Sequence, residues 1–166
     1  GRANEEPMTA ITLTEFGIVV GSLFLPETSR GKVIIGKDTR LSGYLIESAI
    51  TAGLASAGMD SILVGPMPTP AISMLTKDTN ADLGIMISAS HNPFEDNGIK
   101  LFGPDGYKLT DEMESKIENM MNQNCSTLLA SPRDLGRAFR LEEADKKYIE
   151  YLKKKQYLYK KNKPVD

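Results

Sequence analysis

The sequence predicts an α/β fold, with a mixed, mainly parallel sheet sandwiched between helices. Three short apolar segments of strand length, at 32–37, 61–65 and 82–88, alternate with longer segments whose apolar residues recur at helical spacing. Parallel strands need a crossover connection, usually a helix, so this order indicates a parallel sheet. The third strand, "DLGIMIS", is apolar on both faces, as in a sheet that helices cover on both sides.

The chain begins with a helix, a strand and a second helix. Apolar residues recur at helical spacing between Leu13 and Phe24, and the β-branched run "KVIIGK" at 32–37 has the length of a strand. A second helix is predicted over 46–57, because its apolar residues again recur at helical spacing. Gly58 is placed to end this helix.

Capping residues and turns define the later elements. Thr69 is expected to cap a third helix with Pro70 at its first position, where a missing amide hydrogen costs nothing. After the third strand, "GIKLFG" and "YKL" predict an antiparallel addition to the sheet. Thr110 is expected to cap the next helix, whose methionines at helical spacing indicate core packing rather than a cofactor site. A polar loop at 122–134 then leads to a last helix at about 141–155.

Composition favours one soluble domain. The chain has 166 residues, of which 40% are hydrophobic, so it can bury a sizeable core. Its net charge of −2 provides no basic face for nucleic acid or an anionic membrane.

The lysine-rich segment 141–166 is interpreted as a solvated helix end or a linker. Cys125 is the only cysteine, so no intramolecular disulfide can form. With no membrane span or signal peptide evident, a cytoplasmic protein is expected.

Polar and charged side chains follow the predicted strands. In open α/β sheets, ligands bind beyond the carboxyl ends of the strands. The loops at this edge, "GKDTRLSG", "GPMPTP" and "SASHNPFEDNG", together with the strand that follows the last of them, contain Arg40, Thr69, Ser90, His91 and Lys100. The sequence therefore predicts that these five residues share one neighbourhood.

Phosphoryl transfer fits these residues better than hydrolysis. Adjacent residues in an extended chain point to opposite sides, so His91 is not expected to activate Ser90, and the chain has neither a second histidine nor a G-x-S-x-G elbow. A phosphate needs cations and a proton carrier, which Lys100, Arg40 and His91 can supply. Neither Walker A nor G-x-G-x-x-G occurs, so nucleotide binding is not indicated.

The string "SASHNPFEDNGIKLFGPDGYKL" at 88–109 resembles the phosphoserine loop of the α-D-phosphohexomutase superfamily, usually T-A-S-H-N-P followed by N-G-[IFY]-K. "GKDTRLSG" is similar to a second motif of that superfamily, and Ser88 stands where threonine is usual. The resemblance implies that Ser90 is the phosphoserine, which gives a phosphoryl group to the sugar and recovers one from a bisphosphorylated intermediate. It also implies that His91 serves the substrate side of the phosphate.

The same resemblance implies the roles of the surrounding residues. Lys100 matches a position credited with proton transfer and phosphate contact, and Arg40 matches an active-site arginine. Asn92 and Thr69 are expected to bind substrate or phosphate. Mg²⁺ is the implied metal, to which the phosphate on Ser90 contributes one oxygen, while the usual D-G-D-x-D-R ligand loop does not occur in this sequence.

Within the superfamily, "GRANEEPMT" and the phosphoserine string are most similar to the branch that interconverts glucosamine 6-phosphate and glucosamine 1-phosphate through a hexosamine 1,6-bisphosphate. The expected partners are a phosphorylated hexosamine and the other domains of a longer chain, and an oligomer remains open. The sugar-reading G-E-x-S-G loop does not occur, so a phosphomannomutase or phosphoglucomutase is an alternative, as is a non-catalytic binding module.

The resemblance also predicts the domain organisation. Residues 1–140 correspond to the first, phosphoserine-bearing domain, shortened at its N-terminus because the usual F-G-T-D-G-[IV]-R is not found before Gly1. Residues 141–166 correspond to the helix and linker that lead to an absent second domain. Such a piece is expected to lack turnover by itself.

Overall fold

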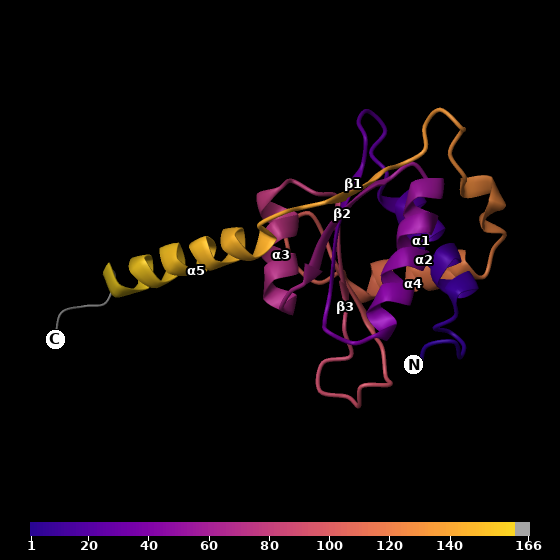
Figure 1. The fold of residues 1–166 in the computed structure, drawn as a ribbon. Coiled ribbons are helices and arrows are strands. Elements are labelled where there is room, and N and C mark those ends of the chain that lie inside the picture. Colours follow the sequence, from indigo (N-terminus) through magenta and orange to yellow (C-terminus); the bar gives the residue numbers. More distant parts are fainter. Residues whose placement is uncertain (162–166) are drawn as a thin grey trace.

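The computed structural model describes residues 1–161 and confirms the predicted α/β class (Figure 1). Within these residues one sheet has the strand order β4-β3-β1-β2-β5. Neighbouring strands are parallel except β4, which runs antiparallel to β3 as predicted. The strands are β1 (Lys32–Lys37), β2 (Asp60–Pro66), β3 (Leu83–Ile87), β4 (Ile99–Phe102) and β5 (Ala138–Arg140).

Helices cover both faces of the sheet. Three of them, α1 (Ala10–Phe24), α2 (Ser42–Ser56) and α4 (Asp111–Met121), lie on one face, and α3 (Thr69–Asp78) lies on the other (Figure 1). The last helix, α5 (Ala144–Lys161), begins against the α3 side and extends away from the sheet. None of the helices in residues 1–161 has the length and apolar character needed to cross a membrane.

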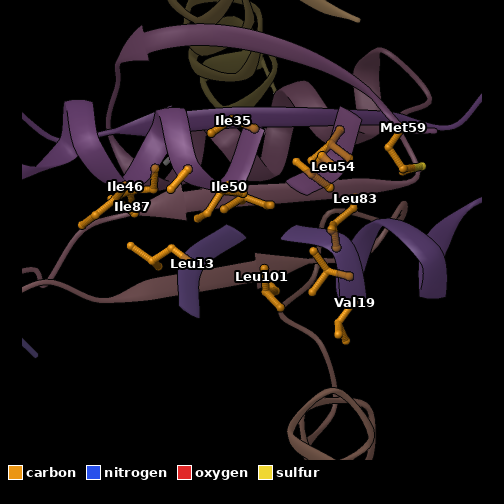
Figure 2. Packing of buried hydrophobic residues seen from close by; sticks show 14 of the residues in the cluster. Leu13, Val19, Ile35, Ile46, Ile50, Leu54, Met59, Leu83, Ile87 and Leu101 are labelled. Atoms are coloured by element: carbon orange, nitrogen blue, oxygen red, sulfur yellow. The ribbon is translucent and has the colours of Figure 1, made fainter. Parts of the chain in front are cut away.

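The sheet separates two apolar clusters. Every residue of β3 is buried, because α1 and α2 cover one face of the sheet and α3 covers the other. Figure 2 shows the larger cluster, in which Leu13 and Val19 of α1 and Ile50 and Leu54 of α2 pack together with residues of the sheet. The methionines of α4 do contribute to the core, since Met120 and Met121 pack against this cluster.

Most predicted caps are present, with one correction. The Thr110 hydroxyl accepts from the Met113 N–H, which confirms the start of α4. Gly58 adopts a φ of +91° directly after α2, where it closes a C-terminal turn that most other residues would strain. Thr69, by contrast, makes no capping hydrogen bond. It is itself the first residue of α3, and Pro68 precedes it in extended conformation.

The C-terminal third differs most from the prediction. The loop at 122–134 contains a single 3-10 turn, Cys125–Leu128, and β5 was not predicted. All three residues of β5 are exposed, so no buried alternation marks them as a strand. The last helix begins at Ala144 and continues to Lys161, beyond its predicted end at 155. Residues 162–166, the end of the predicted linker, lie outside the described residues.

Candidate active site

The register of the sheet brings the carboxyl ends of three strands level. Lys37, the last residue of β1, pairs with Pro66 of β2 on one side and with Ile87 of β3 on the other. Beyond the strands, the Asp38 N–H donates to the Ile87 carbonyl at 3.0 Å, and the Met67 N–H donates to the Lys37 carbonyl at 3.0 Å. The loops that follow β1, β2 and β3 therefore leave from one edge, as predicted.

Ser90 lies exposed in the loop after β3. Its φ of +56° is left-handed, which is uncommon for a residue other than glycine. The Ser90 N–H donates to the hydroxyl of the buried Ser88 at 3.0 Å, and the Asn92 N–H donates to the Ala89 carbonyl at 3.1 Å. Ser88, which replaces the usual threonine, thus keeps the hydroxyl that supports the turn.

His91 contacts the Ser90 hydroxyl, contrary to the expectation for adjacent residues. Ser90 Oγ and His91 Nδ1 are 3.1 Å apart. The expectation assumed an extended chain, but the left-handed conformation of Ser90 turns the backbone, so the two side chains point to the same side. Within residues 1–161 the other ring nitrogen of His91 has no hydrogen-bond partner, so the pair lacks the third group of a hydrolytic triad.

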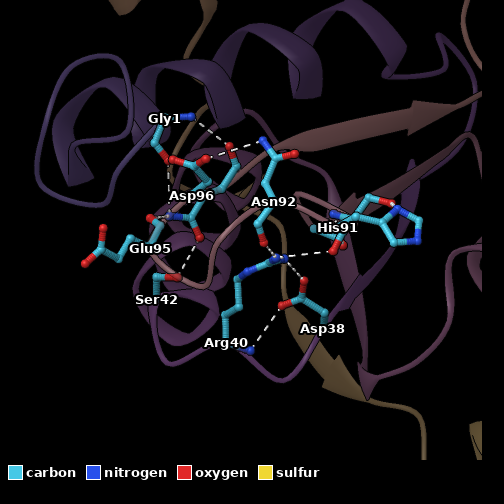
Figure 3. Close-up of polar contacts among 11 residues, drawn as sticks. Gly1, Asp38, Arg40, Ser42, His91, Asn92, Glu95 and Asp96 are labelled. Carbon is cyan, nitrogen blue, oxygen red and sulfur yellow. Dashed lines mark hydrogen bonds and ion pairs between the residues drawn. The ribbon is translucent and has the colours of Figure 1, made fainter.

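Arg40 reaches the serine loop from the turn after β1 (Figure 3). Its Nη2 donates to the carbonyl of Ser90 at 3.3 Å and to that of Asn92 at 2.9 Å. Its Nη1 donates to the Asp38 carboxylate. Arg40 Nε is buried and has no hydrogen-bond partner among the described residues. The predicted proximity of Arg40 and Ser90 is therefore present, but the guanidinium bonds the loop's carbonyls.

Lys100 and Thr69 lie at the same edge of the sheet, and within residues 1–161 neither side chain forms a hydrogen bond or ion pair with the serine loop. Lys100 is half-buried on β4 opposite Met86, and within residues 1–161 its ammonium has no hydrogen bond or ion pair. Thr69 is half-buried at the start of α3, and no hydrogen bond joins its side chain to Ser90 in the same residues. The structure thus gathers Arg40, His91 and Asn92 around Ser90, and leaves Lys100 and Thr69 outside that contact network.

Two polar side chains that were not predicted to belong to the site also form hydrogen bonds at the carboxyl edge of the sheet. Asp38 binds Arg40, and the "D-T-R" spacing in the sequence was the signal that could have revealed it. Asn97 is buried, accepts from the Ser42 hydroxyl at 2.5 Å and donates to the Glu95 carbonyl at 3.1 Å. Asn97 lies in the "D-N-G-I-K" string, and because Asn before Gly is typical of an ordinary turn, the pattern did not mark it as a site residue.

An open hollow of about 600 Å³ lies beside Arg40. It is lined by residues of the N-terminal segment, the turn after β1 and the serine loop, chiefly Arg2, Thr39, Arg40, Ser42, Phe94 and Glu95. Among residues 1–161, no cluster of three or more histidine, cysteine or carboxylate side chains is arranged to hold a metal ion. The described residues therefore do not fit a complete Mg²⁺ site.

The fold and the site together define an α/β/α domain with a serine-bearing loop at the carboxyl edge of its sheet. The chain belongs to the phosphoglucomutase/phosphomannomutase family, whose model for the alpha/beta/alpha domain I matches residues 1–127. The superfamily resemblance carried by residues 88–109 is thereby confirmed.

Relatives within the family are considerably longer than this chain. The chain is 60% identical over 153 residues to the phosphoglucosamine mutase of Granulibacter bethesdensis, covering 92% of this chain and 34% of that protein. It is 56% identical over 154 residues to the phosphoglucosamine mutase of Azorhizobium caulinodans, covering 93% of this chain and 34% of that protein. The chain thus spans about a third of the length of these relatives.

A solved structure supports the fold independently. The phosphoglucomutase/phosphomannomutase family protein of Burkholderia thailandensis superposes with a TM-score of 0.74 at 23% sequence identity. The match covers 90% of this chain and 32% of that protein. At this identity the likeness shows the fold alone.

Proposed function

We propose that this chain is the phosphoserine domain of a phosphoglucosamine mutase, in which Ser90 carries the phosphoryl group exchanged between the two ends of glucosamine phosphate. The observation that carries the proposal is the exposed Ser90 hydroxyl at the sheet edge, 3.1 Å from an imidazole nitrogen. The names of two relatives that are 60% and 56% identical support the choice of glucosamine over mannose or glucose.

The proposed reaction is a pair of phosphoryl transfers. The bond between Ser90 Oγ and phosphorus breaks while a sugar hydroxyl forms the new bond to phosphorus and gives its proton to the neutral amine of Lys100. His91 Nδ1, protonated, gives a proton to the departing Ser90 oxygen. In the second transfer the sugar bisphosphate returns its other phosphoryl group to Ser90, which gives its proton back to His91. The sugar oxygen that leaves phosphorus takes back the proton held by Lys100. The 3.1 Å contact supports this role for His91 on the serine side of the phosphate.

The other predicted residues supply charge and hydrogen bonds. Lys100 has no ion-pair partner in residues 1–161, so it is available to neutralise phosphate as an ammonium or, as the neutral amine, to accept a proton. Thr69 begins α3, and the partial positive charge at a helix N-terminus favours a phosphate there. Arg40 belongs to the proposed site through its hydrogen bonds to the carbonyls of Ser90 and Asn92. We assign Asn92 to phosphate binding from its exposed place two residues after Ser90.

The remaining parts of the activity belong to a longer protein. We propose that residues 1–140 form its first domain and that 141–166 lead to the next. Mg²⁺ would take one oxygen from the phosphate on Ser90 and its other ligands from outside this chain. A hexosamine 1,6-bisphosphate is the proposed intermediate and activator, a phosphorylated hexosamine the substrate, and the cytoplasm the location.

The test uses the longer protein that contains this chain. After incubation with glucosamine 1,6-bisphosphate, intact mass should rise by about 80 Da in part of the population, with the phosphate on Ser90. Ser90→Ala should remove the added mass and the turnover of glucosamine 6-phosphate. Ser115→Ala, at an exposed serine of α4, is the matched control and should keep both.

Four results would contradict the proposal in whole or in part. The phosphate could be found on another residue, or Ser90→Ala could retain turnover. Faster turnover of mannose 6-phosphate or glucose 6-phosphate than of glucosamine 6-phosphate would keep the phosphoserine role and assign a different sugar. A wild-type protein with neither added mass nor turnover would favour the non-catalytic binding module.

A further inference from the structure

Asp38 connects the end of β1 to the active-site arginine. One carboxylate oxygen, Oδ1, accepts from the backbone N–H of Arg40 at 3.1 Å, and the other, Oδ2, accepts from Arg40 Nη1. The Asp38 N–H donates to the carbonyl of Ile87, the last residue of β3. Asp38 is therefore fixed to the strand from which the serine loop departs, and both of its side-chain oxygens are used on Arg40.

Arg40 continues this connection to the serine loop (Figure 3). Nη2 donates to the carbonyls of Ser90 and Asn92, while Nη1 is held by Asp38. The side chain is only 12% exposed, and the adjacent carboxylate balances its charge. Both terminal nitrogens are thus committed to protein oxygens. Such an arrangement is typical of a cross-link between two loops rather than of an open phosphate ligand.

The conformation of Ser90 requires such support. A left-handed residue other than glycine costs about 1–2 kcal/mol, so it persists only where neighbouring groups hold it. Ser88 Oγ accepts from the N–H of Ser90, and Arg40 donates to the Ser90 carbonyl. Within residues 1–161 no other hydrogen bond reaches that carbonyl. The peptide groups on both sides of Ser90 are therefore anchored, which sets the direction of its hydroxyl.

We propose that Asp38 is a positioning residue, which acts through Arg40 to hold Ser90 in the left-handed conformation that presents its hydroxyl at the sheet edge. This inference rests on the phosphoserine role proposed above. Asp38 touches neither the sugar nor the phosphate in this assignment. Its effect is to fix the angle at which the reacting oxygen meets the substrate, and misplacement of about 1 Å can cost 10²-fold in rate.

A purely electrostatic role for Arg40 predicts the opposite response to loss of the Asp38 charge. If Arg40 served mainly to attract phosphate, the carboxylate of Asp38 would weaken that attraction, and Asp38→Asn would lower KM without lowering kcat. If Arg40 is held by Asp38 as a cross-link, Asp38→Asn loosens the serine loop and lowers kcat. The two roles therefore differ in the sign of the effect.

The experiment compares two isosteric variants in the longer protein. Asp38→Asn should raise amide hydrogen exchange about tenfold in peptides that cover 88–93, and should lower kcat about tenfold or more, with KM for glucosamine 6-phosphate unchanged or lower. Asp105→Asn is the matched control, because Asp105 Oδ1 also accepts from the N–H two residues later, Tyr107, at 3.0 Å, but binds no arginine. It should leave exchange at 88–93 and kcat at wild-type values.

Arg40→Lys provides a second arm that does not depend on folding of the first variant. Lysine keeps the positive charge but cannot bond Asp38 and two carbonyls in the same planar geometry. It should reproduce faster exchange and lower kcat, and the double variant should be no worse than the poorer single one. Unchanged exchange at 88–93 in both variants, or a lower KM at wild-type kcat in Asp38→Asn, would overturn the proposal. Exchange needs no turnover, so it still decides the proposal if the wild-type protein proves inactive.

Discussion

Lys37 and Glu47 form a buried ion pair just before the turn that carries Asp38. Lys37 Nζ donates to Glu47 Oε1 at 2.7 Å, and the two side chains are 4% and 11% exposed. The ammonium also lies 4.0 Å from the centre of the Tyr44 ring. Glu47 Oε2 has no hydrogen-bond partner in the described residues. The informative change is Glu47→Gln, which preserves the shape of the side chain and removes the charge opposite the ammonium.

The expected loss follows from the burial of the pair. At 2.7 Å and an effective dielectric constant of about 20, Coulomb's law gives about 6 kcal/mol of attraction. Removing both charges from water offsets most of this, so the intact pair contributes little net stability. Loss of one partner leaves the desolvated Lys37 without a counter-charge, which typically costs about 3–5 kcal/mol. We expect about 3 kcal/mol for Glu47→Gln, because the amide oxygen of glutamine can still accept from the ammonium.

Urea unfolding of the 166-residue chain, followed by far-UV circular dichroism, measures this loss, and the chain contains no tryptophan for fluorescence. Glu114→Gln is the matched control: it breaks an ion pair with Lys108 whose side chains are 35% and 61% exposed, and it should cost less than about 1 kcal/mol. Lys37→Met combined with Glu47→Gln should recover much of the loss, since no buried ammonium remains. Equal losses for Glu47→Gln and Glu114→Gln would refute the reasoning.

Two further stability predictions concern a carboxylate and a helix contact. Burial raises the pKa of Asp60, but the hydrogen bonds and charge of Arg137 outweigh it and hold the pKa below 3.8. Asp60 therefore stabilises the fold at pH values above its unfolded-state pKa, and this stabilisation is lost as pH falls through its folded-state pKa. The urea midpoints of wild type and Asp60→Asn should differ at about pH 7 and converge as the pH is lowered. A Cβ at Gly53 would lie 2.1 Å from the Thr14 carbonyl oxygen, so Gly53→Ala should cost about 1–3 kcal/mol in the same assay, whereas Ser48→Ala, exposed on α2, should be nearly neutral.

Strong local patterns allowed most of the fold to be predicted. The bounds of β1 were predicted as observed, because a β-branched run between polar turns has few alternatives. The cap of α4 at Thr110 also follows from local chemistry. The strand β5 has no such signal, since its three residues are exposed and its pairing with β2 depends on contacts distant in sequence. One of these contacts is the Arg137 N–H, which donates to Asp60 Oδ1 at 2.8 Å.

The members of the site were easier to predict than their contacts. Ser90, His91 and Arg40 were identified from motifs and from their places after parallel strands, and the structure does bring them together. The direction of the His91 side chain could not be predicted, because it depends on the φ of Ser90. A glycine at position 90 would have indicated a left-handed conformation, but the residue there is serine. Lys100 was assigned to the same neighbourhood, but on β4, opposite Met86, it makes no hydrogen bond or ion pair with the loop in residues 1–161.

The adjacency of β1 and β3 explains why a local turn at Ser90 depends on residues about fifty positions earlier. The Ser90 loop leaves β3 beside the turn that leaves β1, so the side chain of Arg40 can bond carbonyls of the loop. A left-handed serine supported only by its neighbours in sequence would relax to a more common conformation. The parallel register of β1 and β3 therefore does more than gather side chains at one edge. It places Arg40 where it can stabilise the left-handed conformation of Ser90, and that conformation brings Ser90 Oγ into contact with His91.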